Sequence, residues 1–408
     1  MWLLPIAVGL SSLFWQQSSA SGVKNLVVFG DSYSDVGNLQ RLSNGPFWSE
    51  NLAVGWDASI YSFAFDGAVC DNELFASDTS GAMPSIKDQI EMYYNEQLNL
   101  EPNETVYAFW IGLNDIDLAF KQENGTSLWD GIVDCISTQM RNVRKVFGSN
   151  RYLVINIPPL EKMPYFNGDD KRKEAAEALN ERLLRSVTSL NKHHRALEMD
   201  LVDVHALVND LVENPSQFGF EDASHSYWDS CQGQCTDAMD DYLWWDKVHL
   251  TGGAHRAIAN SILLSGSLEP KISLASVEEV KKSIEKDKRF QSPTYTAQDN
   301  TGIIDKVIKE IMDKKAKEDE SKSAIMDDAD SEDLVKGDSE EDDNDSSGSF
   351  GHIYFVLMVT VLLCIGFVWF ARRQKRSNGL AALSGLLKGN NNGRGRFMPL
   401  QNLESTNA

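Results

Sequence analysis

A serine, an aspartate and a histidine stand in stretches whose spacing suits nucleophilic catalysis. Ser32 closes the turn Gly30-Asp31-Ser32, directly after the apolar run 26–29, and Asp246 precedes His249 by three residues. A serine hydroxyl attacks a carbonyl only with the help of a neighbouring base. An imidazole oriented by a carboxylate can supply that base. Ser32, His249 and Asp246 are therefore candidates for the nucleophile, the base and the orienting acid of an acyl transfer.

Two further stretches could supply hydrogen-bond donors for the oxyanion of such a reaction. Gly67 lies in the stretch 62–68, and Asn114 follows the apolar run 106–111. Glycine suits a point where the backbone approaches a substrate closely, and asparagine offers an uncharged amide donor. We expect the N–H groups of Ser32 and Gly67 and the amide of Asn114 to form an oxyanion hole. The alternatives are a turn glycine and a helix-capping asparagine.

Other side chains near these stretches have supporting roles in this hypothesis. Polar residues expected to hold the loops are Asp31, Asp35, Asn38 and Asp115, and aromatic residues expected to line a pocket are Phe47, Trp48 and Trp245. For the first two aromatics, an ordinary place in the core is the alternative. No acidic partner at the spacing of Asp246 and His249 is expected for the remaining histidines, which are His193, His194, His205, His225 and His255. Only His255 stays a second candidate base, because it is close to His249 in the sequence.

These four stretches, in this order, resemble the GDSL (SGNH) hydrolase superfamily over residues 23–266. The Gly67 stretch is the least distinctive of the four. The resemblance implies an acyl-enzyme on Ser32, no metal and no organic cofactor. It also implies a flavodoxin-like strand order. The stretches around Asn114 and His249 are similar to fungal acetylesterases and to secreted lipase/acylhydrolases, so the expected substrate is a short acyl ester of a carbohydrate, with an acyl lipid as the alternative.

The hydrophobic pattern predicts strands alternating with helices. Apolar, β-rich runs mark strands and amphipathic spacing marks helices; the expected strands are 26–29, 60–65, 104–111, 151–157 and 199–204, and the expected helices are 84–98, 128–147, 173–197 and 252–264. This alternation predicts an α/β fold, a three-layer α/β/α sandwich around a five-stranded parallel sheet. Residues 216–241 are expected to form an irregular loop over the site.

The chain has 408 residues and a net charge of −22, from 38 basic and 60 acidic residues. This balance argues against a nucleic-acid partner, whose phosphates would repel the protein. Residues 1–20 have the pattern of a signal peptide. Residues 353–371 are apolar and uncharged, and basic residues follow them, which predicts a single membrane span with the amino-terminal part outside. We therefore expect a type I membrane protein of the secretory pathway or cell surface.

The expected organisation is a catalytic head at 21–268, a charged and largely disordered acidic stalk at 269–350, the span, and a cytoplasmic tail at 372–408. Four cysteines precede the span, which suggests two disulfides. A local Cys231–Cys235 loop with a Cys70–Cys135 bond is the preferred pairing; a zinc site is the alternative. Sequons that suggest glycosylation stand at Asn103, Asn124 and Asn344.

A protein of another class could also explain the topology. A non-enzymatic surface protein could use the same kind of head to bind a glycan or a partner. A pure binding module has no need for the complete set of Ser32, Gly67, Asn114, Asp246 and His249, and this favours the ester hydrolase.

Overall fold

A computed structural model describes residues 22–332, apart from 77, 78, 80, 123–127, 233, 235 and 236. The predicted signal peptide, the predicted span at 353–371 and the predicted cytoplasmic tail lie outside these residues. Asn124, Cys235 and Asn344 lie outside them as well. Within the described part of the chain, none of the helices combines the length and the apolar character that a membrane crossing requires.

A central sheet of five parallel strands organises the molecule, in the order β2-β1-β3-β4-β5. The strands are β1 (Asn25–Gly30), β2 (Ser59–Ser62), β3 (Thr105–Trp110), β4 (Arg151–Ile155) and β5 (Glu198–Val202). The inner strands β3 and β4 are buried along their whole length, because helices cover both faces of a parallel sheet. The predicted fold class and the flavodoxin-like strand order are confirmed.

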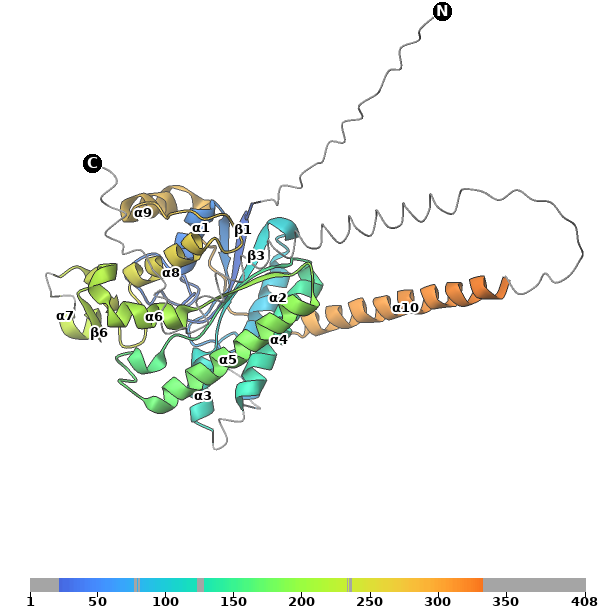
Figure 1. Cartoon of the computed structure of the whole chain (residues 1–408), viewed down its shortest axis with the longest axis horizontal. Helices are drawn as coiled ribbons and strands as arrows, with labels where there is room; N and C mark the ends of the chain where they lie inside the picture. The colour runs from blue at the N-terminus through green and yellow to red at the C-terminus, as the bar shows by residue number, and fades with distance from the viewer. Residues whose placement is uncertain are drawn as a thin grey trace, which may run out of the picture.

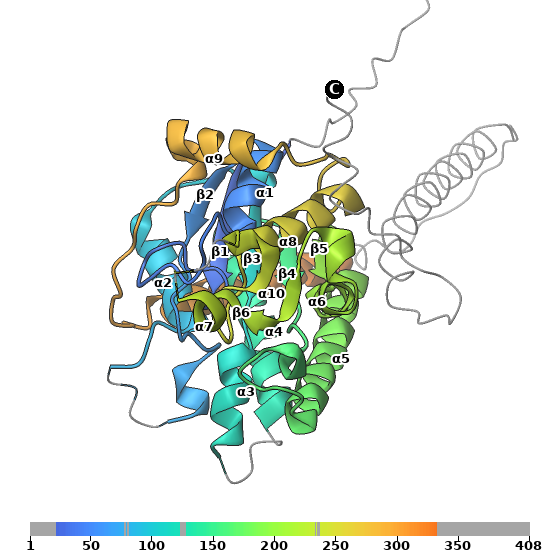
Figure 2. The ribbon, with the colours of Figure 1, turned by 90° about the vertical axis from the view of Figure 1, so that its left-hand side faces the viewer.

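Helices cover the two faces of the sheet (Figures 1 and 2). They are α1 (Trp48–Trp56), α2 (Ile86–Glu96), α3 (Leu113–Phe120), α4 (Leu128–Phe147), α5 (Asp170–His193), α6 (Val204–Glu213) and α8 (Gly252–Ser265). Helices α1 and α8 pack against each other, and α4 packs against α2 and α5. Short 3-10 turns connect these elements at Asn72–Leu74, Pro102–Glu104, Leu160–Lys162, Pro215–Phe218 and Met239–Asp241.

The segment 216–241 is more regular than its sequence predicted. It contains β6 (Asp222–Ser226) and α7 (Tyr227–Cys231), and β6 pairs in parallel with β7 (Tyr242–Trp244) in a second, two-stranded sheet. Strand β6 is polar and only partly buried, so it carries no alternating apolar pattern that could have revealed it.

The predicted start of a disordered stalk at residue 269 is wrong. Helix α9 (Val277–Lys286), the turn Lys288–Phe290 and the start of α10 (Ile303–Glu332) pack on the head. The side chains that this segment buries are those of Leu274, Val280, Phe290, Tyr295 and Ile304. Isolated apolar residues in a charged sequence are a weak signal for a core, but here each one packs against the head and is buried there. Residues 333–350 lie outside the described part.

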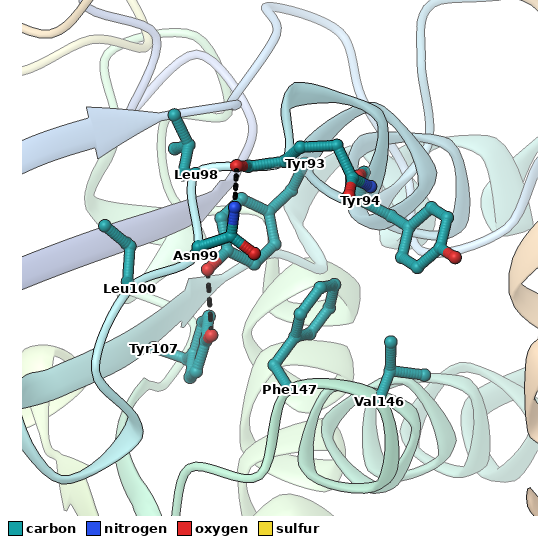
Figure 3. Close-up of a pocket in the computed structure, with 9 residues that line it drawn as sticks. Tyr93, Tyr94, Leu98, Asn99, Leu100, Tyr107, Val146 and Phe147 are labelled. Atoms are coloured by element: carbon teal, nitrogen blue, oxygen red, sulfur yellow. Dashed lines mark hydrogen bonds between the residues drawn. The ribbon is translucent and has the colours of Figure 1, made fainter.

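A pocket of about 250 Å³ lies where the carboxyl ends of α2 and α4 meet (Figure 3). Its lining includes Tyr93 and Tyr107, whose hydroxyl groups are hydrogen-bonded at 3.0 Å. None of the residues predicted to act in catalysis lines it.

Candidate active site

The turn after β1 places Ser32 at the carboxyl edge of the sheet, where ligands bind in such folds. Gly30 allows this turn because a Cβ atom there would lie 2.7 Å from the carbonyl oxygen of Trp110 on β3. The side chain of Gln89 on α2 holds Gly30 from the other side. Its amide accepts from the Gly30 N–H and donates to the Gly30 carbonyl, both at 2.9 Å. Gln89 is not among the residues predicted from the sequence, although a polar residue on the inward face of the predicted helix 84–98 is a usable signal.

The loop after β2, residues 63–68, lies directly against this turn. The N–H of Phe65 donates to the carbonyl of Gly30 at 3.2 Å, and the N–H of Asp66 donates to Asp35 at 3.0 Å. Gly67 has a φ of +79°, a conformation that favours glycine. Among the described residues, the N–H groups of Ser32 and Gly67 have no hydrogen-bond acceptor. Both are therefore available to a developing oxyanion.

The loop after β3 completes this side of the site. Gly112, with a φ of +125°, is the N-cap of α3, and the Asn114 amide in the first turn of this helix donates to the carbonyl of Ala68 at 2.9 Å. An amide nitrogen has two hydrogens, and the second has no acceptor among the described residues. Asn114 is thus held beside the Gly67 loop, with one donor left for a ligand.

Asp35 and Asn38 hold the loops together, as the sequence predicted. Asp35 accepts hydrogen bonds from the N–H groups of Gly37 and Asn38 as well as from Asp66. The amide of Asn38 donates to the carbonyls of Ser62 and Ala64, at 2.8 and 2.9 Å.

His249 and Asp246 form the pair that their spacing predicted. Nδ1 of His249 lies 2.7 and 2.9 Å from the two carboxylate oxygens of Asp246, which also accepts from the N–H groups of Val248 and His249. Burial works against ionisation, but these hydrogen bonds outweigh it and hold the pKa of Asp246 below its usual value. With Nδ1 donating to Asp246, Nε2 of His249 is the nitrogen free to accept a proton.

Tyr33 connects two turns, the nucleophile turn at residues 30–35 and the histidine turn at residues 246–249. Its hydroxyl donates to the carbonyl of Val248 at 2.6 Å, and its ring lies 5.9 Å from the imidazole of His249, centre to centre. The neighbours of Ser32 and His249 in the sequence are therefore in direct contact. The two catalytic candidates themselves share no hydrogen bond in this structure; in the absence of substrate such bonds are often long.

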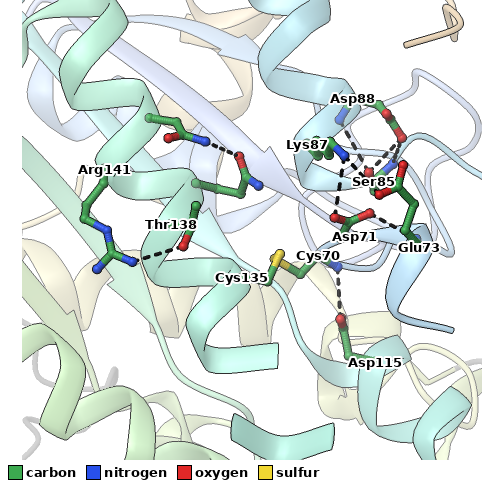
Figure 4. The surroundings of a disulfide bond; sticks show 12 residues. Cys70, Asp71, Glu73, Ser85, Lys87, Asp88, Asp115, Cys135, Thr138 and Arg141 are labelled. Carbon is green, nitrogen blue, oxygen red and sulfur yellow. Dashed lines mark hydrogen bonds and ion pairs between the residues drawn. A yellow bond between two sulfur atoms is a disulfide. The ribbon is translucent and has the colours of Figure 1, made fainter. Parts of the chain in front are cut away.

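Two buried carboxyl groups lie beneath the rim. Burial is the main cause that raises the pKa of Asp31 to about 8 and that of Asp115 to about 7, and Asp115 adds to the effect at Asp31. One oxygen of Asp115 accepts from the N–H of Cys70 at 3.0 Å (Figure 4), and the other has no described partner. At neutral pH, the raised pKa values keep Asp31 predominantly protonated and Asp115 only partly ionised, unlike Asp246, whose pKa is lowered.

The predicted Cys70–Cys135 disulfide is confirmed (Figure 4). It joins the loop after β2 to α4. Cys231 is also disulfide-bonded, and Cys235, its expected partner, lies outside the described residues. Asn103 is exposed between α2 and β3, which is compatible with its predicted glycosylation.

The aromatic residues predicted to line a pocket are corrected in two cases. Phe47 and Trp48 are fully buried: Phe47 packs on His255, and Trp48 donates to Ser34 and packs on Trp110. They are core residues because the start of α1 turns inward, with Phe47 at its N-cap and Trp48 as its first residue. Trp245 is half-buried and stacks on Tyr227, beside the histidine turn.

Two expectations about the other histidines also change. His255 is buried against Phe47, and this burial lowers its pKa to about 3, so it cannot replace His249 as an accessible base. His225 does have an acidic partner. Asp222 precedes it by three residues, and its carboxylate lies 2.9 Å from Nδ1 of His225. The spacing was present in the sequence and was overlooked.

A parallel α/β sheet with a serine after its first strand and an Asp–His pair at the same edge is typical of serine hydrolases. Residues 26–262 match the model of the GDSL-like Lipase/Acylhydrolase family, and the chain belongs to this family. It is thereby an ester-bond hydrolase by class.

Individual relatives are distant. The thermolabile hemolysin of Vibrio parahaemolyticus is 22% identical in an alignment 289 positions long, which covers 60% of this chain and 64% of the hemolysin, slightly under two thirds of its length. An acetylesterase of Hypocrea jecorina is 24% identical in an alignment 295 positions long, which covers 55% of this chain and 84% of that protein. A solved acetylxylan esterase of Geobacillus stearothermophilus has 13% identity and a TM-score of 0.38, covering 60% of this chain and 94% of its own.

Proposed function

We propose that the chain hydrolyses carboxylic esters through an acyl-enzyme on Ser32. His249 takes the hydroxyl proton as Ser32 Oγ attacks the ester carbonyl, and Asp246 stabilises the imidazolium that forms. The N–H groups of Ser32 and Gly67 and the amide of Asn114 receive the oxyanion. His249 then gives its proton to the leaving alcohol and activates a water that releases the acid.

The observation that carries this proposal is the double contact between Asp246 and His249. It fixes the tautomer and leaves Nε2 to act as the base. The Tyr33 contact to the carbonyl of Val248 supports it, because it binds the turn of the base to the turn of the nucleophile.

We further propose a short acyl group, acetyl first, on a carbohydrate. Two exposed aromatic residues border the histidine turn: Tyr165 and Trp228 are 63% and 52% exposed. The backbone N–H of Tyr165 donates to the carbonyl of Lys247, and that of Trp228 donates to the carbonyl of Trp245. Flat aromatic faces pack well against the apolar faces of sugar rings. The Hypocrea relative is an acetylesterase, which supports acetyl as the acyl group.

Labelling of the full chain with a fluorophosphonate tests the mechanism. We expect labelling of the wild type and none of Ser32→Ala. Equal labelling of both would favour the alternative, a binding protein without catalysis. Rates on p-nitrophenyl esters of increasing chain length test the acyl group. A maximum at acetate supports the esterase, and a maximum at long chains supports a lipase or phospholipase-type acylhydrolase.

Entry into the secretory pathway remains part of the proposal, as does anchoring by the span predicted at 353–371. The Cys70–Cys135 disulfide supports the first, since such bonds persist in oxidising compartments. Protease protection of the head in intact microsomes is the expected result; a head that is digested there would contradict it.

A further inference from the structure

The segment between α9 and α10, residues 287–302, forms a strap along the edge of the sheet (Figure 2). Arg289 pairs with Asp57, next to α1, at one end. At the other end, the buried carboxylate of Glu91 on α2 accepts from the Thr301 hydroxyl and from the N–H of Ile303. The strap is therefore fixed at both ends, and it lies outside the residues that the family model matches.

In its middle, the strap bonds to the edge strand β2. The hydroxyl of Ser292 accepts from the N–H of Ser62 at 2.8 Å, and the hydroxyl of Ser62 donates to the carbonyl of Ser34 at 2.8 Å. A chain of two hydrogen bonds thus leads from the strap, through the end of β2, to the nucleophile turn.

Tyr295 connects the strap to the Gly67 loop, residues 63–68. Its ring stacks on Phe63, with ring centres 3.9 Å apart and planes 17° from parallel. Its N–H donates to the side-chain oxygen of Asn38 at 2.8 Å. Asn38 is also the residue whose amide holds the carbonyls of Ser62 and Ala64, on either side of Phe63.

We propose that the strap positions the oxyanion hole. The buried ring of Tyr295 fixes Phe63 and places its own N–H on Asn38, so that the Gly67 loop keeps the N–H of Gly67 directed at the substrate. The inference rests on the function proposed above and makes Tyr295 a positioning residue, because it acts through Asn38 and Phe63.

Variants of the full-length chain separate this role from general stability. Tyr295→Ala removes the stacked ring, and Tyr295→Leu keeps an apolar filling in case the alanine variant does not fold. Tyr295→Phe is the conservative variant, because the hydroxyl makes no hydrogen bond with the described residues. Phe290→Ala is the matched control: Phe290 is a buried aromatic residue of the same strap, 7% exposed against 6% for Tyr295.

On p-nitrophenyl acetate, we expect Tyr295→Ala to lower kcat by about tenfold or more, since small displacements of catalytic groups cost up to about a hundredfold. KM should stay within about twofold. Tyr295→Leu should lower kcat in the same direction, and Tyr295→Phe should restore it. Phe290→Ala should lose stability with an unchanged kcat. A Tyr295→Ala or folded Tyr295→Leu enzyme with the kcat of Phe290→Ala would overturn the proposal.

Amide hydrogen exchange gives a second readout that needs no activity. The N–H groups of Asp66 and Ala68, both hydrogen-bonded, should exchange faster in Tyr295→Ala than in Phe290→Ala. If the wild type neither hydrolyses esters nor labels at Ser32, the proposed function is wrong. Equal exchange in the two variants would then also refute the strap's hold on the loop, and faster exchange in Tyr295→Ala would support it.

Discussion

Two stretches of the chain carry an aspartate three residues before a histidine, and they fold alike. In Asp246/His249 and in Asp222/His225, the carboxylate holds Nδ1 of the histidine, at 2.7 and 2.9 Å. Each aspartate also accepts from the backbone N–H groups two and three residues later. The local structure of the two pairs is therefore the same.

Their surroundings differ. The side chain of His249 is 15% exposed and lies beside Tyr33 of the nucleophile turn, whereas that of His225 is 72% exposed on β6. The Asp-x-x-His spacing thus makes an oriented imidazole wherever it occurs. Under the proposed mechanism, only His249 acts on Ser32, because it lies at the carboxyl edge of the main sheet beside the turn of Ser32.

The largest effect expected from this difference is a loss of activity when His249, and not His225, is replaced. His249→Ala should lower kcat/KM on p-nitrophenyl acetate by about 10⁴-fold or more, because removing the base of a triad has effects of that order. His225→Ala should stay within about twofold of the wild type. Comparable losses in the two variants would show that the exposed pair takes part in catalysis.

The aspartates should repeat the pattern with a smaller effect. Asp246→Asn should lower kcat by about 10²–10⁴-fold, since an amide cannot fix the same tautomer or stabilise imidazolium. Asp222→Asn is the control at the other pair, with an unchanged kcat. Steady-state kinetics measures kcat for both variants. An Asp246→Asn enzyme with the kcat of the wild type would remove Asp246 from the mechanism.

A third aspartate extends the comparison to stability. Burial raises the pKa of Asp31 to about 8, so the native state keeps a proton that the unfolded chain releases above about pH 4. Stability should therefore fall as the pH rises from about 4 to 8, by up to about 1.4 kcal/mol per pH unit from this group.

Urea unfolding at pH 5 and pH 7.5 measures this fall. Asp31→Asn should reduce it, and the part due to Asp115 should remain. Asp222→Asn should leave it unchanged, because the pKa of Asp222 is below its usual value and the group is ionised at both pH values. A wild type that is equally stable at both would contradict the buried, protonated state of Asp31.

The smallest effect is expected at Trp228, where the region of the Asp222/His225 pair contacts the region of the Asp246/His249 pair. Trp228 lies on α7, three residues after His225 of β6, and packs on Trp245, beside the histidine turn. Trp228→Ala should raise KM for acetylated xylooligosaccharides by about three- to tenfold, because an aromatic contact contributes about 0.5–1.5 kcal/mol. KM for p-nitrophenyl acetate should not change. An equal rise for both substrates would argue against a sugar-binding role.

The strands, their parallel arrangement and the main catalytic candidates could be predicted because each depends on a few neighbouring residues. A β-rich apolar run such as 26–29 defines a buried strand, and Gly30-Asp31-Ser32 places a turn after it. The DxxH spacing defines an Asp–His pair by local backbone geometry alone. It does not say which of two such pairs lies beside the turn of Ser32, because that depends on the tertiary structure.

The sequence by itself determined the family, the five parallel strands and the residues that could perform ester hydrolysis, because these follow from short patterns of apolar, turn-forming and catalytic residue types. Only the tertiary structure decided that Phe47 and Trp48 belong to the core, that Gln89 holds Gly30, and that residues 287–302 fold back onto the Gly67 loop. Those outcomes depend on hydrogen bonds and ring contacts between residues far apart in the chain, and no local pattern specifies such partners.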